Sequence, residues 1–265
     1  MRMCSIASGS SGNCIYIGDE DTHILIDAGI SRKAIETGLK ELELSGNDLD
    51  GIFITHEHSD HVKGLGVMAR KYHIPMYGTK ETIEAVKAIS SLGNIGEELF
   101  HPVAAEEELQ LKTLTVKPFK VSHDGANPVA YRVESGEKKA AVATDLGIYN
   151  DYTIDHLKGL DVILLEANHD IRMLQTSRYP YSLKQRILGK YGHLCNEMSG
   201  RLLDAILSDK MKRVFLGHLS NENNYPDLAY ESVRVEVNMS QRDYKAEDFH
   251  ISVAKRDSIS DCFEF

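Results

Sequence analysis

The sequence predicts an α/β fold in which strands and helices are layered as a sandwich. Short apolar or β-branched runs alternate with longer stretches that have helical patterns. Residues able to bind metal follow several apolar runs directly, where a strand would end and a loop would begin. A chain of 265 residues can bury a sizeable core in one domain. We therefore expect residues 1–265 to form a single domain without an inserted cap.

In the first half of the chain, strands and helices should alternate. The expected strands are residues 14–17, 23–26 and 51–54. The expected helices are residues 31–42 and 61–72, and Ser31 can cap the first of them. An αβ stretch should cover residues 75–92, with Thr79 as a further cap.

The second half begins with short β-rich runs over residues 109–143, which Gly, Pro and Asn separate. Buried strands should resume at residues 162–166 and 214–215. Helices are expected over residues 182–190 and 196–207.

The composition is that of a globular protein, with 42% hydrophobic and 26% charged residues. No apolar run approaches the ~18 residues of a membrane span, and the first residues do not resemble a signal peptide. The four cysteines are scattered, which favours reduced thiols over disulfides; they are Cys4, Cys14, Cys195 and Cys262. These observations predict a cytoplasmic protein.

The most informative segment is residues 55–61, with the sequence THEHSDH. Five of these seven residues can bind a metal, and the segment follows the apolar run 51–54. Imidazole and carboxylate ligands suit zinc, manganese or iron, so the metal is left open. Two imidazoles two residues apart, His56 and His58, can reach one ion, while Asp60 and His61 point toward a second.

This segment resembles the HxHxDH motif of the metallo-β-lactamase superfamily of hydrolases. The family pattern expects four further residues at strand ends, and the sequence has all of them in order: Asp27, His123, Asp145 and His218. The resemblance implies an αββα sandwich of two mixed sheets flanked by helices. It also implies two divalent metal ions.

The resemblance further implies a role for each residue of the motif. The first metal would be held by His56, His58 and His123, and the second by Asp60, His61 and His218. Asp145 would bridge both ions. Asp27 would orient neighbouring ligands without binding metal itself.

Three other segments are similar to the bacterial YycJ (WalJ) group of this superfamily, which is regarded as a 5′ to 3′ DNA exonuclease. They are residues 7–14 (ASGSSGNC), 165–170 (LEANHD) and 217–224 (GHLSNENN). The Gly- and Ser-rich run could also turn tightly and present backbone N–H groups to an anion.

The implied chemistry is attack on a phosphodiester by a hydroxide that bridges the two metals. Asp60 or Asp145 can accept the proton from the water. His193, in the segment 191–194 (YGHL), is expected to hold a phosphate or to protonate the leaving group. Four further residues are candidates to line the site or bind substrate: Glu166, Asn168, His169 and Asn223.

Charge bears on the substrate. A net charge of −10 lacks the broad basic footprint of a nucleic-acid-binding protein, although metal ions would supply local positive charge. Basic residues gather beside His193 at Arg172, Arg178, Lys184, Arg186 and Lys190, where they could contact phosphates.

Three functions are therefore open. The first is a DNA exonuclease or phosphodiesterase. The second is a hydrolase of a small ester, thioester, lactam or cyclic phosphate. The third is a non-catalytic member that binds metal and a regulatory partner. Strand polarity, the choice between DNA and RNA, and the oligomeric state are not readable from the sequence.

Overall fold

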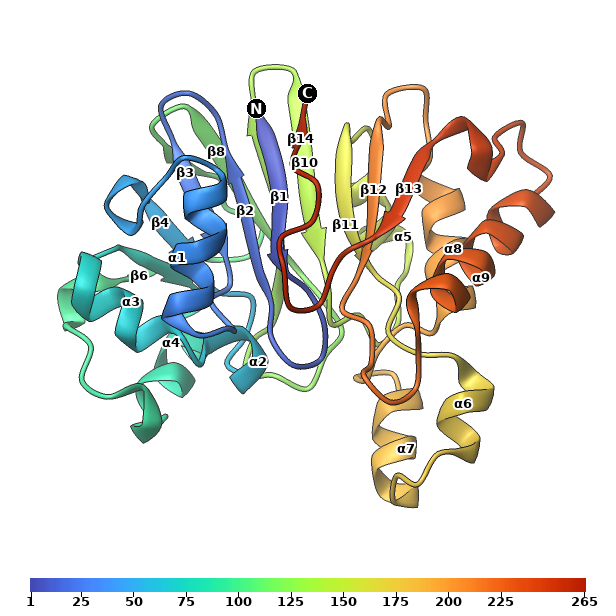
Figure 1. Cartoon of the computed structure of the whole chain (residues 1–265), viewed down its shortest axis with the longest axis horizontal. Helices are drawn as coiled ribbons and strands as arrows, with labels where there is room; N and C mark the ends of the chain where they lie inside the picture. The colour runs from blue at the N-terminus through green and yellow to red at the C-terminus, as the bar shows by residue number, and fades with distance from the viewer.

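Two seven-stranded sheets face each other, and helices cover the outer side of each (Figure 1). This arrangement comes from a computed structural model that describes all residues from 1 to 265. The layers are those of the expected αββα sandwich of two mixed sheets. In each sheet a run of antiparallel strands is followed by parallel strands.

The first sheet has the strand order β14-β1-β2-β3-β4-β5-β6. Its strands are β1 (Arg2–Ala7), β2 (Cys14–Gly18), β3 (His23–Ile26), β4 (Gly51–Phe53), β5 (Met76–Gly78), β6 (Phe100–Pro102) and β14 (Phe263–Glu264). The second sheet has the order β13-β12-β11-β10-β9-β8-β7. Its strands are β7 (Leu109–Leu111), β8 (Leu114–Lys120), β9 (Val129–Ser135), β10 (Lys138–Ala143), β11 (Val162–Glu166), β12 (Arg213–Gly217) and β13 (His250–Val253).

The helices α1 to α4 accompany the first sheet, and α5, α8 and α9 accompany the second (Figure 1). The bounds are α1 (Arg32–Glu41), α2 (Ser59–Val62), α3 (Leu65–Tyr72), α4 (Lys80–Lys87), α5 (Asp151–Leu157), α6 (Ile171–Thr176), α7 (Tyr181–Leu188), α8 (Asn196–Ile206) and α9 (Pro226–Met239). Short 3-10 helices cover Gly46–Asp48, Ser90–Leu92, Glu97–Leu99 and Ala246–Asp248. The expected caps are present, because the side chains of Ser31 and Thr79 accept from Ala34 N and Thr82 N.

The alternation of side chains along each strand divides the core into three clusters. In β3, Ile24 and Ile26 face the opposite sheet, whereas Leu25 packs against helices. In β11, Leu164 joins the cluster between the sheets, and Ile163 and Leu165 pack against the helices on the outer side. Apolar side chains on both faces explain why these strands are continuous apolar runs in the sequence.

The prediction of one continuous helix over residues 61–72 is wrong, because the chain forms two helices there, α2 and α3. The break lies at Gly64, whose backbone N–H donates to Ala28 O at 2.8 Å. A Cβ at this position would lie 2.1 Å from Ile30 O. The backbone of the preceding loop therefore packs against Gly64, and this tertiary contact interrupts the helix.

Helices α6 and α7 project from the body of the molecule beyond the ends of the second sheet (Figure 1). The chain leaves and re-enters the body at one place, where His169 and Cys195 form a parallel β-bridge. The expected helix over residues 182–190 corresponds to α7. No helix in the structure has both the length and the apolar character that crossing a bilayer requires.

We propose that residues 1–265 form one domain, because the central cluster takes side chains from both sheets. Replacing the fully buried Leu164 with Ala should lower the free energy of unfolding by roughly 2–5 kcal/mol, through lost burial and a cavity. Thermal unfolding followed by circular dichroism and by tyrosine fluorescence should show one coincident transition, shifted to lower temperature. The exposed Leu188→Ala variant is the control, and two separate transitions would contradict a single domain.

Candidate metal centre

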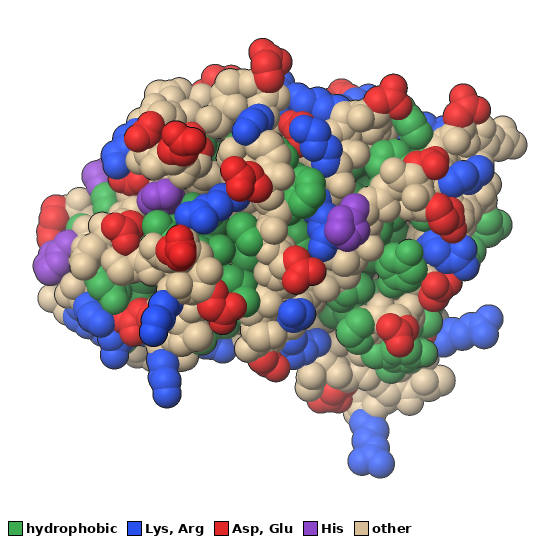
Figure 2. Space-filling model, turned by 45° about the horizontal axis from the view of Figure 1, so that its top comes forward, with side chains coloured by type: hydrophobic (Ala, Val, Ile, Leu, Met, Phe, Trp, Pro, Cys, Tyr) green, Lys and Arg blue, Asp and Glu red, His purple; other side chains and the backbone are tan.

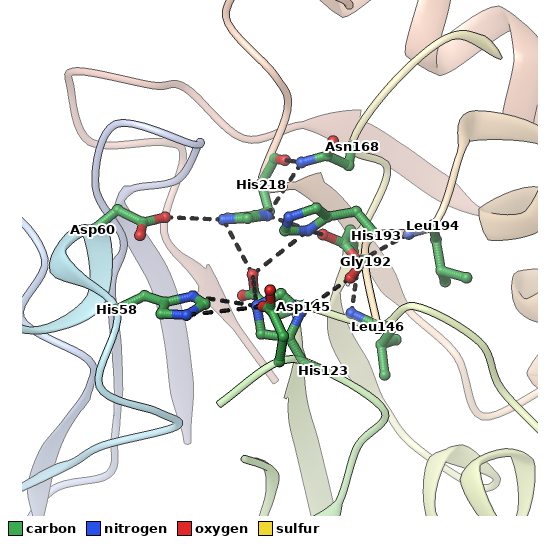
Figure 3. A network of polar contacts seen from close by, with 12 residues as sticks. His58, Asp60, His123, Asp145, Leu146, Asn168, Gly192, His193, Leu194 and His218 are labelled. Carbon is green, nitrogen blue, oxygen red and sulfur yellow. Dashed lines mark hydrogen bonds and ion pairs between the residues drawn. The ribbon is translucent and has the colours of Figure 1, made fainter. Parts of the chain in front are cut away.

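Polar side chains converge where strands of both sheets end. Asp27 follows β3, and the segment 55–61 follows β4 in the first sheet. In the second sheet, His123 follows β8, Asp145 follows β10 and His218 follows β12 directly. These strand ends lie along one edge of the sandwich, so residues distant in sequence meet there (Figure 3).

The structure forms four groups of potential metal ligands, two of which contain Asp145: one with His56 and His61, and one with Glu166, His193 and His218. In each group the ligand atoms lie within 4.8 Å of one another, the spacing around a single ion. Of the two groups without Asp145, the first is His56, His58 and His123. The second group is Asp60, His61 and His218. Both groups are the ones that the family resemblance implies.

Asp145 lies between the two groups. Its carboxylate oxygens are 3.2 Å from His61 Nε2, 3.5 Å from His123 Nε2 and 3.6 Å from His218 Nε2. It also forms a group with His56 and His61. One carboxylate is thus within reach of ligands from both sets, as a bridging ligand has to be.

Two buried polar atoms support the assignment of a metal to this place. His56 Nε2 and Asp145 Oδ2 are buried, and neither has a hydrogen-bond partner. Buried polar atoms are nearly always satisfied, so such atoms need an explanation. A divalent cation would satisfy both, and a set of imidazoles and carboxylates suits such an ion.

The residues of the cluster shift one another's pKa values. Burial alone would lower the pKa of His61, but Asp145, Asp60 and Asp27 raise it well above the ordinary value. Burial lowers the pKa of His56, and neighbouring histidines lower it further. The carboxylates thus favour the protonated form of His61, whereas burial favours the neutral form of His56.

Asp27 holds the ligands from behind. Its Oδ2 lies 2.7 Å from His61 Nδ1. Its two oxygens also accept from Thr55, at 2.9 Å from the backbone N–H and 2.8 Å from the hydroxyl. These contacts orient the His61 ring so that Nε2 faces Asp60 and Asp145. The expected orienting role agrees with this geometry.

Glu166 holds the opposite side of the cluster. Its Oε1 lies 2.8 Å from His193 Nδ1 and 2.9 Å from His218 Nδ1, while Oε2 accepts from the backbone N–H groups of Leu146 and Leu194. Burial would raise the pKa of Glu166, but the two histidines lower it to about 2. Glu166 therefore belongs to the site but does not line its cavity as expected, because this carboxylate is fully buried and its oxygens are already engaged.

His193 lies at the cavity beside the two ligand groups, with 14% of its side chain exposed. Since Nδ1 is bound to Glu166, the other ring nitrogen is free for a substrate. The residue before it contributes to the centre as well, because Gly192 O lies 3.0 Å from His123 Nδ1. Figure 3 shows this arrangement around Asp145.

The other three candidate residues support the site more than they face it. Asn168 lines the cavity, but its Nδ2 donates to His218 O at 2.9 Å. His169 is buried, and burial with the charge of nearby His193 lowers its pKa to about 4. Asn223 is fully buried beside Ser220 and does not line the cavity, so its expected contact with substrate is wrong. Sequence alone could not separate these placements, because burial at a loop depends on distant strands.

The Gly- and Ser-rich run near the N-terminus could have presented N–H groups to an anion, but the structure uses it in another way. Its backbone N–H groups are used internally, for example from Ser10 to Leu219 O and from Asn13 to Asp60 O. The hydroxyl of Ser8 accepts from His218 N at 2.9 Å. The run therefore positions two residues of the metal groups instead of presenting donors to an anion.

The cavity at the centre has a volume of about 200 Å³. It is lined by residues of both ligand groups, by Ser10 and Ser220, and by side chains on or just before α7. The last set is Tyr179, Leu183, Arg186 and Ile187. A larger cavity of about 610 Å³ lies between α1 and residues 256–259 and contains no histidine. We assign the chemistry to the smaller cavity, because only there do metal-binding side chains converge.

Of the expected basic group, only Arg186 lines this cavity. It makes a two-pronged contact with Asp124, whose Oδ1 lies 3.3 Å from His123 Nε2. Lys184 instead donates to Gln175 O and Ser177 O, both at 2.7 Å, and so fixes the turn between α6 and α7. Of the five basic residues that could contact phosphates, Arg186 alone therefore lies at the cavity.

Replacing Asp27 with Asn should keep the shape of the site while weakening its hold on His61. Asn tolerates the left-handed backbone of this residue (φ 63°), but it loses the negative charge that orients the imidazole. We expect metal affinity to fall by roughly 10–100-fold, measured by competition with a chelator. Asp21→Asn, at an exposed turn, should bind metal normally, and an unchanged affinity in the Asp27 variant would remove its orienting role.

Comparison with known proteins agrees with this geometry. Residues 22–218 match the Beta-lactamase superfamily domain. The chain is 41% identical over 228 residues to exodeoxyribonuclease YycJ of Bacillus anthracis, with 86% of each protein covered. It is 39% identical over 225 residues to exodeoxyribonuclease WalJ of Streptococcus pneumoniae, with 85% of this chain and 84% of that protein covered.

Solved structures show the same fold at low sequence identity. Zn²⁺-bound PqqB from Methylobacterium extorquens has a TM-score of 0.72 at 17% identity, covering 98% of this chain and 100% of that one. The metallo-β-lactamase fold protein YhfI from Bacillus subtilis has a TM-score of 0.68 at 15% identity, covering 98% of both. From the matched domain, the close relatives and the shared αββα layers, the chain belongs to the β-lactamase superfamily and has the metallo-β-lactamase fold.

Proposed function

We propose that this protein is a metal-dependent phosphodiesterase that degrades DNA as a 5′ to 3′ exonuclease, with two divalent ions at its centre. The observation that carries the proposal is the pair of ligand groups joined by Asp145. It is supported by the identity of 39–41% to two exodeoxyribonucleases over about 85% of the chain. The four cysteines are free, which fits a protein of the cytoplasm.

Each ion has a ligand set in this proposal. His56, His58 and His123 would hold one, Asp60, His61 and His218 the other, and Asp145 both. Zinc, manganese and iron all suit such ligands. When bound, a pair of ions lowers the pKa of water and stabilises negative charge on a phosphodiester.

The residues of the chain then orient this centre and move protons. Asp27 and Glu166 hold His61 and His218 through their Nδ1 atoms, so each ring presents Nε2 to Asp60 and Asp145. Asp60, which is 24% exposed at its side chain and lines the cavity, is placed to accept a proton from water. Asp145 is the alternative acceptor from the same side.

His193 is placed to protonate the leaving oxygen. Its Nδ1 lies 2.8 Å from Glu166 Oε1, and this contact fixes the orientation of the ring. The proton on Nε2 then points into the cavity and can pass to the alkoxide as the phosphorus–oxygen bond breaks.

The cavity favours a phosphodiester over a bulky small molecule. Its volume of about 200 Å³ is below the ~300–1,000 Å³ of pockets that enclose drug-sized ligands. It has Arg186 at its wall, and guanidinium groups bind phosphate well. The cavity can thus take a backbone phosphate while the attached nucleosides lie outside.

The metal requirement gives one prediction. Elemental analysis of the reconstituted protein should find about two ions per chain, because seven ligands form two sets. Asp145→Asn keeps the backbone conformation but removes the shared charge, so it should lose bound metal and most activity. Fully active protein with a single ion would contradict the dinuclear centre.

A second prediction concerns the proton donor. His193→Ala should retain both metals and lower kcat by roughly 10²–10⁴-fold, the usual contribution of a general acid. The matched control is His101→Ala, which replaces an exposed histidine on β6 in the first sheet. A wild-type rate in the His193 variant would remove this residue from the mechanism.

The substrate is tested with oligonucleotides labelled at either end. A 5′ to 3′ exonuclease should release a labelled mononucleotide from a 5′-labelled strand at the earliest times, and a ladder of shortening products from a 3′-labelled strand. DNA, RNA and bis-p-nitrophenyl phosphate should be compared with each metal. If only small esters or thioesters are hydrolysed, the nuclease assignment fails and a small-ester hydrolase replaces it.

A further inference from the structure

Two cysteines that are far apart in sequence lie opposite each other at the edge of the first sheet. Cys4 is on β1, and Cys262 directly precedes β14, the edge strand that pairs with β1. The antiparallel register joins Met3 to Phe263, so the next pair along it is Cys4 with Cys262. Figure 1 shows the two ends of the chain side by side, which explains how these residues become neighbours.

The hydrogen-bond pattern makes this a pair that a disulfide can bridge. Phe265 N donates to Met1 O at 3.0 Å, and Met1 N donates to Phe265 O at 3.2 Å. Hydrogen-bonded and non-hydrogen-bonded pairs alternate along an antiparallel ladder, so Cys4 and Cys262, three pairs further on, are a non-hydrogen-bonded pair. The Cα atoms of such a pair are about 4.5 Å apart, within the range of about 4.4–6.8 Å that disulfides span.

Both thiols lie on the face of the sheet that the helices cover. Met3 is part of the cluster between the sheets and Phe263 packs against it, whereas Cys4 is part of the cluster on the helix side. Since side chains alternate along a strand, Cys262 turns to the same side as Cys4. The Cys4 thiol donates to Ser260 O at 3.3 Å, so it faces the segment that contains Cys262. Cys4 is fully buried, and Cys262 is exposed.

The two thiols differ in acidity. Interaction with the Cys262 thiol, together with burial, raises the pKa of Cys4. Interaction with Cys4 and with the Arg2 guanidinium lowers the pKa of Cys262, and this outweighs the effect of its partial burial. An exposed thiol with a lowered pKa is the one that an oxidant reaches first. The other two cysteines are buried, which raises the pKa of Cys14 and raises that of Cys195 to about 11.

The surface around the pair suits an uncharged oxidant. Figure 2 turns this end of the molecule toward the viewer, and basic and acidic side chains are intermixed over it. A surface that concentrates charged ligands gathers charge of one sign. Hydrogen peroxide has no charge and needs only access to the exposed Cys262.

We propose that Cys4 and Cys262 form a reversible thiol–disulfide pair that hydrogen peroxide oxidises. The Cys262 thiolate attacks one peroxide oxygen, the O–O bond breaks, and a sulfenic acid and one water result. Cys4 then attacks the Cys262 sulfur, the S–S bond forms, and the departing hydroxide takes up the Cys4 proton as a second water. The two thiols lose two electrons, which the peroxide accepts. Disulfides with an exposed sulfur are readily reduced again by a thiol, so the pair can cycle in a reducing compartment. This proposal does not depend on the phosphodiesterase function.

The bond would fix the last part of the chain against the loop behind the metal groups. Lys255 O accepts from Ser8 N at 3.1 Å, and Ser8 Oγ accepts from His218 N. Arg256 Nη2 donates to Leu219 O at 2.8 Å. A cross-link between residues so distant in sequence restricts the unfolded chain strongly. We therefore expect the oxidised protein to be the more stable form.

Formation of the bond is tested by mass spectrometry on zinc-loaded protein treated with a small excess of hydrogen peroxide. The intact protein should lose two hydrogens, and digestion without reduction should give one peptide pair joined through Cys4 and Cys262. Dithiothreitol should separate the pair. Cys262→Ser should give no joined peptides, and the control Cys195→Ser should give the same pair as the wild type.

The effect on stability is tested by thermal unfolding of the same samples. Oxidised wild-type protein should unfold about 5–10 °C above the reduced protein, the shift expected for a typical disulfide in a chain of this size. In Cys262→Ser the peroxide treatment should leave the unfolding temperature unchanged.

Three results would overturn the pair. The first is oxidation of Cys262 to a sulfinic or sulfonic acid without a link to Cys4. The second is a link from Cys262 to a second copy of the chain, seen as a dimer on a non-reducing gel. The third is a link that joins Cys4 to Cys14. A correctly linked protein with an unchanged unfolding temperature would contradict the stabilising role of the bond.

Discussion

The carboxylate of Asp145 is the point at which the two sheets depend on each other. It is buried, and it lies within 3.6 Å of imidazoles from strand ends of both sheets. A buried carboxylate is stable only with positive charge or hydrogen bonds around it. The ends of β4, β8 and β12 therefore have to meet around β10, and this requirement aligns the two halves of the sandwich.

Convergence at one edge also places strain there. Asp27, Asp145 and His218 have φ values of 63°, 60° and 56°, in the left-handed region that non-glycine residues seldom occupy. Each comes at the end of a strand, where the chain has to turn and still direct a side chain at the centre. Strain of about 1–3 kcal/mol per residue is tolerated where the surroundings fix the conformation. The hydrogen bonds from His218 N to Ser8 Oγ and from Asp27 N to Phe53 O are part of that support.

Short-range patterns in the sequence predicted the strands that lead to the site, and the resemblance to a known family supplied the two ligand groups. The strands β1, β13 and β14 were not expected. The apolar runs before Asp27, His56 and His218 mark buried strands, and the HxHxDH spacing marks ligands. Features set by tertiary contact were not predictable. Glu166 has the same polar character as a site-lining residue, but the strand on which it lies buries it completely. The break at Gly64 depends on a carbonyl of another loop, and the β1–β14 pairing joins opposite ends of the chain.

The segment 171–192, which contains α6 and α7, is joined to the sandwich at a single place. Its two ends are fastened to each other, because Asn168 N donates to Leu194 O and Asn196 N donates to His169 O. None of the three hydrophobic clusters of the sandwich contains a residue from 171–192. A segment closed at its base in this way can vary without disturbing the packing of the sandwich. Changes in the part of this segment that lies away from the cavity would alter the surface beside the cavity while the ligand groups keep their places.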